Sequence, residues 1–444
     1  MKFEKSNTPL FTLEDERVVV LGGGRSGVAA ANLAVARGAE VRLFDSRSEF
    51  TPVGLDPRVE LVFGATPELG STVHSDYLVI SPGIDTYGDL VKSFQRHTTE
   101  LMGELELGFR FYSGTCIGIT GTNGKTTTTE LVTHLLQGLG KDALSCGNHG
   151  TPLSELILTG APEYAVVELS SFQLETISTF RSKVSLWLNL APDHLDRYPD
   201  MAAYRAAKER IFSTLTPEDW KVTRQEEGFT FAHNQVTFST LSKEADYTLQ
   251  DGLISCLDGS MIDLSETRLR GRHNVENVMA AVAAVNCLQL PWTREPAEIL
   301  QDFTPPEHRC ELVRSLNGVE YINDSKSTNI HSLETALEAF DRPLILIIGG
   351  KDKGLEFDAL QGRLAKNVKL CLTIGEIGED LAQLYASEVD TLFCSGLSEA
   401  VQKAQSGANQ GDYVLFSPGT SSFDMFPNYM KRGEAFKDAV EHLT

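Results

Sequence analysis

The sequence has little positive charge and no long apolar run. Its 444 residues include 39 Lys and Arg against 61 Asp and Glu, which gives a formal net charge of −22. Such an excess of negative charge repels a phosphate backbone, so no nucleic-acid partner is expected. No apolar stretch is long enough to cross a bilayer, and residues 1–10 lack the apolar core of a secretion signal. These absences predict a cytoplasmic protein with no membrane partner.

Cysteine is also scarce. The seven cysteines are scattered, and no two have the C-x-x-C spacing of a metal or redox site. An odd number without a pairing pattern predicts free thiols in a reducing compartment. Low-complexity tracts and internal repeats are absent, and the hydrophobic content of 41% is that of an ordinary globular chain. The length allows two to four domains.

What the sequence does contain, from residue 17 onward, is an alternation of short β-rich apolar runs with helical periodicity. This alternation predicts an α/β fold with parallel sheets. We expect strands in three consecutive units, at residues 17–21, 40–44, 77–81, 116–120, 164–168, 184–189, 318–324, 344–350, 368–375 and 412–419.

Residues 219–265 differ, because alternating polar and apolar residues with turn signals predict a small antiparallel appendage. The Pro-Pro of "FTPPEHR" (303–309) marks a stiff boundary. We therefore predict a Rossmann-like N-terminal domain at 1–103. A central P-loop ATPase-type α/β domain with the appendage should follow at 104–305, and a Rossmann-like C-terminal domain at 306–444.

Two glycine-rich loops follow predicted strands. The first, "GGGRSG" at 22–27, fits the G-x-G-x-x-G fingerprint, and Asp45 follows the next strand; alone, this indicates an NAD enzyme. The second, "GTNGKTT" at 121–127, resembles a Walker A loop but lacks its first glycine, since Ile119 stands there. Its glycines and the following helix N-terminus suit phosphate, Lys125 would neutralise it, and a Thr hydroxyl would reach Mg²⁺.

Polar residues gather where predicted parallel strands end, and such ends are where open α/β sheets bind ligands. Glu168 follows an apolar strand, as the carboxylate of an ATPase metal site does. The segment after the next strand adds further candidates, although a loop histidine or a helical lysine is by default a surface residue: Asp193, His194, Asp196 and Lys208. The other strand-end residues are Ser81, Asn189, Asp324, 349–353 and 417–422.

Several motifs, in order along the chain, resemble those of the Mur ligases of peptidoglycan synthesis: "GTNGKTTT", "ELSSFQLE", "DHLDRY…YRAAK", "GRHNVEN", "HR" at 308–309, "NDSKSTN" and "SPGTSSFDMF". "ELSSFQLE" and "NDSKSTN" point to the branch that joins glutamate to UDP-N-acetylmuramoyl-L-alanine. The resemblance implies a UDP-binding domain, an ATPase domain and an amino-acid-binding domain. It also implies two small-molecule substrates, ATP, two Mg²⁺ ions, an acyl-phosphate intermediate and carbamylation of Lys208.

The resemblance also implies roles for individual residues. It implies a catalytic role for Lys125, Glu168, His194, Lys208, Arg309 and Lys326. It assigns ATP to Gly121, Thr122, Asn123, Gly124, Lys125, Thr126, Thr127, Asn274, Asn277, Arg309 and Asp324. It assigns the UDP substrate to Gly24, Arg25, Ser26, Asp45, Ser46, Arg47, Ser81, Gly83 and Asn148. It assigns glutamate to His194, Thr328, Lys353, Ser422, Phe423 and Tyr429, and metal to Thr126, Glu168, His194 and carbamylated Lys208.

Three departures from the family pattern leave questions open. His149 stands where an apolar residue is expected, Tyr429 replaces a Phe, and "GGKDKG" offers both Lys351 and Lys353 for glutamate. The chirality of the glutamate, the base that takes the amine proton and the monomeric state that we expect are not fixed by sequence. Arg309, beyond the Pro-Pro boundary, is expected to enter the site on domain closure.

Competing functions explain fewer of these residues. An NAD-dependent dehydrogenase leaves every motif after residue 120 without a role. A folylpolyglutamate synthase would lack the N-terminal unit, and another Mur ligase would carry different motifs. A non-catalytic nucleotide-binding module predicts lesions in the second loop, yet Lys125, Glu168 and Lys208 are all present.

Overall fold

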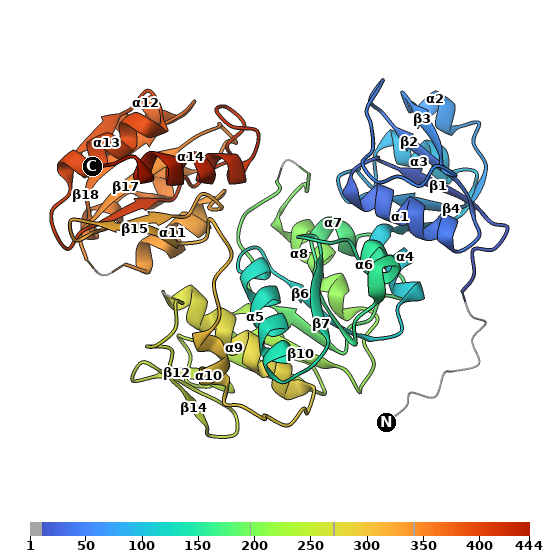
Figure 1. Cartoon of the computed structure of the whole chain (residues 1–444), viewed down its shortest axis with the longest axis horizontal. Coiled ribbons are helices and arrows are strands. Elements are labelled where there is room, and N and C mark those ends of the chain that lie inside the picture. Colours follow the sequence, from blue (N-terminus) through green and yellow to red (C-terminus); the bar gives the residue numbers. More distant parts are fainter. Residues whose placement is uncertain (1–10, 196, 270, 341) are drawn as a thin grey trace.

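The computed structural model describes residues 11–195, 197–269, 271–340 and 342–444. Each of its three lobes is built on a sheet of its own (Figure 1). The N-terminal lobe is blue, the central one runs from teal through green to yellow, and the C-terminal one is orange and red. The predicted α/β class is confirmed.

The N-terminal sheet is fully parallel. Its order is β3 (Glu60–Phe63), β2 (Glu40–Asp45), β1 (Arg17–Leu21), β4 (Ser75–Ile80) and β5 (Thr98–Gly103). Its helices are α1 (Arg25–Ala36), α2 (Pro67–Gly70), α3 (Asp89–Gln95) and α4 (Glu104–Phe111). The Val-rich β1 is central because both of its faces are buried. The strand order reverses between β1 and β4, and such a reversal opens a ligand crevice at the strand ends.

The central sheet has the order β14 (Met261–Ile262), β13 (Leu253–Ser255), β12 (Tyr247–Gln250), β11 (Gln235–Ser239), β10 (Trp220–Arg224), β9 (Val184–Trp187), β6 (Thr115–Thr120), β8 (Tyr164–Glu168) and β7 (Ala143–Gly147). Its α-helices are α5 (Lys125–Gly138), α6 (Leu153–Gly160), α7 (Ser171–Leu174), α8 (Met201–Glu209), α9 (Arg272–Cys287) and α10 (Pro296–Gln301). α5 and α9 pack together over one face of the sheet.

The predicted antiparallel appendage at 219–265 is smaller than expected. Only β12, β13 and β14 pair antiparallel. β10 and β11 instead continue the parallel sheet beyond β9, and β12 pairs parallel with β11. The prediction of direction was wrong for 220–239, because alternation reports a half-buried strand but carries no information about the direction of its neighbour.

The C-terminal sheet has the order β15 (Glu311–Leu316), β16 (Val319–Asn323), β20 (Tyr413–Phe416), β17 (Leu344–Gly349), β18 (Val368–Ile374) and β19 (Thr391–Phe393). Only β15 is antiparallel to its neighbour. The α-helices are α11 (Ile330–Glu338), α12 (Gly378–Tyr385), α13 (Leu397–Gly407) and α14 (Tyr429–Glu441). α13 and α14 cover one face, and α11 and α12 cover the other.

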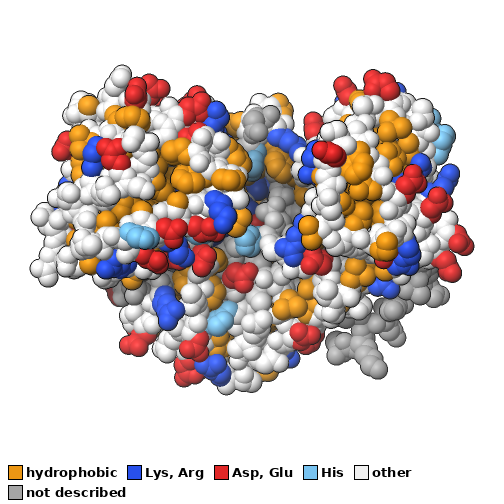
Figure 2. Space-filling model, turned by 45° about the horizontal axis from the view of Figure 1, so that its top comes forward, with side chains coloured by type: hydrophobic (Ala, Val, Ile, Leu, Met, Phe, Trp, Pro, Cys, Tyr) orange, Lys and Arg blue, Asp and Glu red, His pale blue; other side chains and the backbone are white. Residues whose placement is uncertain are grey.

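All seven cysteines are free, as predicted. None of the described helices is both long and apolar enough to span a membrane. Figure 2 shows the molecule hollowed between the lobes on its left and right.

Candidate active site between the central and C-terminal domains

A cavity of about 740 Å³ lies where the carboxyl ends of the central and C-terminal strands meet. It brings together most of the predicted ATP, metal and glutamate residues: Thr122, Asn123, Gly124, Lys125, Thr126, Thr127, Asn148, Glu168, His194, Lys208, Asn274, Asn277, Arg309, Asp324, Lys326, Thr328, Lys353 and Tyr429. Gly121, Ser422, Phe423 and the residues of the N-terminal domain do not line it.

The phosphate-type loop follows β6 and opens α5. Gly124 is the N-cap, with φ +83°, and a Cβ there would lie 2.5 Å from Asn277 Oδ1. Both the dihedral and the close approach therefore require glycine. Lys125 Nζ donates to the carbonyl oxygens of Gly121 (2.9 Å) and Thr122 (2.8 Å), so the ammonium lies over the loop.

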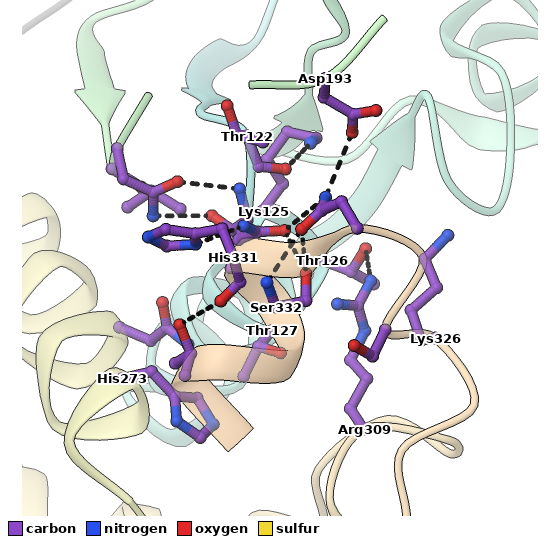
Figure 3. Close-up of a pocket in the computed structure, with 18 of the residues that line it drawn as sticks. Thr122, Lys125, Thr126, Thr127, Asp193, His273, Arg309, Lys326, His331 and Ser332 are labelled. Atoms are coloured by element: carbon purple, nitrogen blue, oxygen red, sulfur yellow. Dashed lines mark hydrogen bonds between the residues drawn. The ribbon is translucent and has the colours of Figure 1, made fainter. Parts of the chain in front are cut away.

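Glu168, at the end of β8, is the centre of a hydrogen-bond chain that crosses the domain boundary. Arg309 NH2 donates to Thr126 Oγ1 (2.7 Å), and Thr126 donates to Glu168 Oε2 (2.7 Å) (Figure 3). Asn148 Nδ2 donates to Glu168 Oε1 (2.8 Å). Burial alone would raise the pKa of Glu168, but Lys125 and these donors outweigh it and the pKa is lowered. The carboxylate is therefore ionised at neutral pH.

Lys208 is 1% exposed, and its Nζ donates to the carbonyl oxygen of Gly121 (2.9 Å). The ammonium also lies 4.7 Å from the centre of the Tyr204 ring. Burial, with the nearby charge of Lys125, holds the pKa of Lys208 well below its ordinary value. The lowered pKa raises the fraction of Lys208 that is a neutral, nucleophilic amine.

His194 lies at a loop position with φ +55°, in the left-handed region that few non-glycine residues adopt. Its ring meets the edge of Phe172 at 4.9 Å, and its Nε2 is 3.9 Å from Asp193 Oδ2. Burial lowers the pKa of His194, so the imidazole is neutral at pH 7. Asp193 also faces the C-terminal domain, since Asn329 Nδ2 donates to its Oδ2 (3.3 Å). Asp196 lies outside the described residues.

Arg309 lies between two residues whose backbone is in the left-handed region, His308 (φ +66°) and Cys310 (φ +46°). Backbone of this kind persists only where the surroundings enforce it. Here the buried His308 is enclosed: Asn323 Nδ2 lies 2.9 Å from its Nδ1, and its backbone N–H donates to Glu311 Oε2 (2.9 Å).

Two ionisable groups of the C-terminal domain have pKa values near neutrality. Burial raises the pKa of Asp324 to about 7, although Ser417 Oγ donates to it (2.8 Å). Burial, followed by the charge of Arg309, lowers the pKa of Lys326 to about 7. Lys326 Nζ lies 4.0 Å from the centre of the Tyr429 ring. Groups that titrate at working pH are suited to proton transfer.

Our sequence reasoning missed the N-terminus of α11 as part of the site. Ser332 Oγ donates to Asn123 Oδ1 (2.8 Å), and His331 Nδ1 lies 2.8 Å from Asn123 Nδ2. In Figure 3, His331 and Ser332 reach from the helix of the C-terminal domain toward the loop that carries Lys125. The signal available was Asn329, a helix N-cap residue directly after the "NDSKST" strand end.

The structure separates the two lysines of "GGKDKG". Lys351 Nζ pairs with Glu376 (2.7 Å) outside the cavity, whereas Lys353 lines the cavity with its Nζ 3.9 Å from Asp193 Oδ1. His149 also lines the cavity. Phe423 is 72% exposed, and Ser422 is buried outside the cavity wall.

The glycine-rich loop of the N-terminal domain, which was predicted to bind the UDP substrate, lies apart from this cavity at the β1/β4 reversal. Gly23 N–H donates to Asp45 Oδ2 (2.7 Å), and Arg47 makes a bidentate pair with the same carboxylate. A Cβ on Gly27 would lie 1.8 Å from the carbonyl oxygen of Gly22. Asp45 is thus committed to the loop and to Arg47, which does not suit an acid that must accept from a ribose hydroxyl.

Arg25 and Ser81, two more residues of this predicted site, lie beside the same loop. Arg25 reaches the central domain, where it pairs with Glu155 (3.2 Å), seven residues after Asn148. Ser81 Oγ donates to the carbonyl oxygen of Gly22 (3.0 Å). The remaining predicted residues of this site lie around the same loops: Gly24, Ser26, Ser46 and Gly83.

The cavity has the donor chemistry that Mg²⁺ prefers. Among the described residues no three His, Cys, Asp or Glu side chains gather into a metal cluster. Glu168, Thr126 and Asn148 nevertheless place one carboxylate and neutral oxygens beside the phosphate-type loop. This set fits Mg²⁺, which takes one or two carboxylates and completes its shell with phosphate oxygens and water.

Comparisons with known proteins agree with this architecture. Residues 16–103 match the Mur ligase MurD-like N-terminal domain, 119–285 the Mur ligase middle domain and 308–419 the glutamate ligase domain of Mur ligases. A UDP-N-acetylmuramoylalanine–D-glutamate ligase of Pelodictyon phaeoclathratiforme is 36% identical over 97% of this chain and 99% of its own. One from Desulfitobacterium hafniense is 38% identical over 96% and 98%.

Solved structures share the fold at lower identity. MurF ligase of Thermotoga maritima, in complex with ADP, has a TM-score of 0.63 at 17% identity and covers 97% of this chain and 96% of its own. UDP-N-acetylmuramate-alanine ligase MurC of the same organism has a TM-score of 0.61 at 19% identity, covering 96% and 99%. Since full-length relatives exceed 35% identity and all three domain models match in order, the chain belongs to the Mur ligase family.

Proposed function

We propose that this chain is an ATP-dependent ligase that adds D-glutamate to UDP-N-acetylmuramoyl-L-alanine, a step of peptidoglycan synthesis. The full-length relatives bear the name of that enzyme. The observation that carries the proposal is the chain Arg309–Thr126–Glu168, because it joins the phosphate-type loop of one domain to a cation of the next. ATP and Mg²⁺ are the cofactors used by Mur ligases, and the cavity residues fit both.

The first step makes the alanine carboxylate reactive. Its oxygen attacks the γ-phosphorus of ATP, the bond to ADP breaks, and an acyl phosphate forms. Charge on the phosphoryl oxygens in such a transfer is stabilised by positioned cations. Lys125 lies on the loop for this role, and Arg309 and Lys326 face it from the C-terminal domain.

The second step joins the amine of glutamate to the acyl carbon, and phosphate leaves with the electron pair of the broken bond. The amine must lose a proton. Asp324 and, if it does not hold Mg²⁺, His194 are the candidates for its acceptor, since burial raises the pKa of Asp324 to about 7 and lowers the pKa of His194. Lys353, Thr328 and Tyr429 line the side of the cavity proposed for glutamate.

Glu168, Thr126 and His194 are the residues proposed to hold Mg²⁺, which would draw negative charge from phosphate oxygens. We infer two ions, with a carbamate on Lys208 as a further anionic ligand. A neutral amine is the form that reacts with CO2, and the lowered pKa of Lys208 raises the fraction of that form. The exclusion of water by domain closure would protect the acyl phosphate.

The N-terminal site is proposed to hold the UDP portion of the substrate. Its loop offers backbone N–H groups and a helix N-terminus to a diphosphate. Arg47, which pairs with Asp45 beside the loop, would add a positive charge. Replacement of Arg47 by Ala should weaken UDP-sugar binding, and NAD should not compete. Competition by NAD would favour the dehydrogenase alternative.

We infer domain limits at 1–103, 104–305 and 306–444, which are supported by the end of the N-terminal family match at 103 and the start of the glutamate ligase match at 308. A monomer in the cytoplasm is proposed, because one chain supplies the whole cavity and all seven cysteines are free thiols. Light scattering of the purified protein measures the assembly state.

The deciding experiment supplies UDP-N-acetylmuramoyl-L-alanine, ATP and Mg²⁺ with D-glutamate, L-glutamate or another amino acid. Phosphate release and the mass of the product are measured. D-glutamate is expected to be the substrate. Turnover with L-glutamate alone would change the stereochemistry, turnover with another amino acid would indicate a different Mur ligase, and no turnover with any would refute the ligase proposal.

A further inference from the structure

A buried guanidinium lies under the carboxyl-terminal edge of the third sheet. Arg432, on α14, is 0% exposed, and in the described part of the chain it donates only to neutral oxygens. A buried charge without a paired carboxylate is unfavourable unless hydrogen bonds compensate it. Burial accordingly lowers the pKa of Arg432 to about 10. Because burial of this charge is unfavourable in free energy, we infer that Arg432 does more than pack the core.

Each side-chain hydrogen bond of Arg432 goes to a loop that follows a strand of the third sheet. Nε donates to Ser325 Oγ (3.1 Å) and NH2 to the Ser325 carbonyl (2.8 Å), both in the loop after β16. NH1 donates to the carbonyl oxygen of Thr420 (3.0 Å), in the loop after β20. One planar fork therefore spans the two loops, which Ser417 Oγ also joins where they begin, by donating to Asp324 Oδ2 (2.8 Å).

The loop after β17 is tied to the same group. Thr420 Oγ1 donates to the Lys351 carbonyl (2.6 Å), and Lys351 N–H donates to the Ser421 carbonyl (3.0 Å). Because β16, β20 and β17 are neighbours in the sheet, the three loops form one continuous rim around Arg432. This rim carries Lys326, Lys353 and Ser422, all assigned to ATP chemistry or glutamate.

Attachment of α14 to the domain does not require these bonds. Phe436 and Val440 anchor the helix in the core. Its carboxyl end is held by another arginine, Arg314, whose NH1 donates to the carbonyl oxygens of Val440 (3.2 Å) and Glu441 (3.1 Å). Arg314 has the same chemistry as Arg432 but touches no loop of the cavity, so it provides a matched control.

We propose that Arg432 is a positioning residue for the ligation: its guanidinium fixes the separation of the loops after β16 and β20, to which the loop after β17 is tied, so that Lys326, Thr328 and Lys353 converge on the incoming amino acid. This inference rests on the proposed function. Arg432 itself does not line the cavity, so it acts through Ser325 and Thr420.

The test measures initial rates of phosphate release against glutamate concentration, with ATP and the UDP substrate saturating. Arg432→Met should raise the KM for glutamate about 10- to 100-fold, since a misplacement of about 1 Å can cost a reaction about 10²-fold. Binding of the UDP substrate, which the N-terminal domain holds, should keep its wild-type Kd. Arg432→Lys should show the same defect, because one ammonium cannot replace a planar fork.

Arg314→Met should lower the thermal midpoint yet leave the KM for glutamate unchanged. If Arg432→Met does not fold, Ser325→Ala decides, with an expected rise in KM of about 2- to 10-fold for each of the two hydrogen bonds lost, from Arg432 Nε and to the Tyr429 carbonyl. A wild-type KM in a folded Arg432 variant, full recovery by Lys, or an equal KM change in Arg314→Met would overturn the inference. An inactive wild-type enzyme would instead refute the proposed function.

Discussion

Replacement of Arg309 by Ala should break the contact between the C-terminal domain and the phosphate-type loop. Arg309 NH2 lies 2.7 Å from Thr126 Oγ1, and Thr126 donates onward to Glu168. A hydrogen bond from a charged group contributes about 1.5–3 kcal/mol, which is about 10- to 150-fold in rate or affinity. Arginines that face a transferring phosphoryl group contribute about 10³–10⁵-fold. Since Lys125 and Lys326 remain, we expect kcat to fall by about 10²–10³-fold.

The same variant should shift a titration. The positive charge of Arg309 is the second cause, after burial, of the lowered pKa of Lys326, about 7. Without that charge the pKa of Lys326 rises, so Lys326 stays protonated to higher pH. Any limb of the kcat–pH profile that reports Lys326 should therefore move to higher pH.

The assay is single-turnover phosphate release in rapid quench, from about pH 6 to 9, the range around the neutral titrations. Arg363→Ala is the control, because Arg363 pairs with Glu334 at the surface, where ion pairs contribute about 0–1 kcal/mol. A kcat near the wild-type value in Arg309→Ala, together with an unshifted pH profile, would refute two claims. These are that Arg309 stabilises the transferring phosphoryl group and that it enters the site on domain closure.

Three further predictions test other parts of the molecule. Gly27→Ala should abolish UDP-sugar binding and spare ADP binding, because the new Cβ would collide with the carbonyl oxygen of Gly22. Gly124→Ala should do the reverse, because its Cβ would collide with the side chain of Asn277. Calorimetry with both ligands checks this, and loss of the same ligand in both variants would contradict it. Lys208 should take up ¹³CO2 as a carbamate signal in NMR that is absent from Lys208→Met, and activity should rise with bicarbonate; a wild-type spectrum without the signal would count against carbamylation. Glu104, buried with its Oε1 accepting from Ser154 N–H, has a pKa raised to about 7 by burial. Its stabilising contribution is therefore present below about pH 4.5 and lost as pH rises toward 7. In urea unfolding, the free energy of unfolding of Glu104→Gln should therefore rise by up to about 3 kcal/mol relative to that of the wild type between pH 4.5 and 8. A pH-independent difference would show that Glu104 is not protonated in the folded state.

Much of the fold follows from local patterns. The Val-rich β1 and the apolar β17 were predicted because both faces of each are buried, which gives continuous apolar runs. β3, β5 and β19 were missed, since they lie at or near sheet edges and are short or partly exposed.

The sequence by itself determined both loops, the residues after each strand end and the family, because glycine spacing, strand ends and motif order are local properties of the chain. Only the tertiary structure decided which of these residues meet. Arg309 reaches Thr126 across 183 residues, Lys353 rather than Lys351 faces the cavity, and α11 contacts Asn123. These contacts depend on how two separately folded sheets pack against each other, and no local pattern encodes that packing.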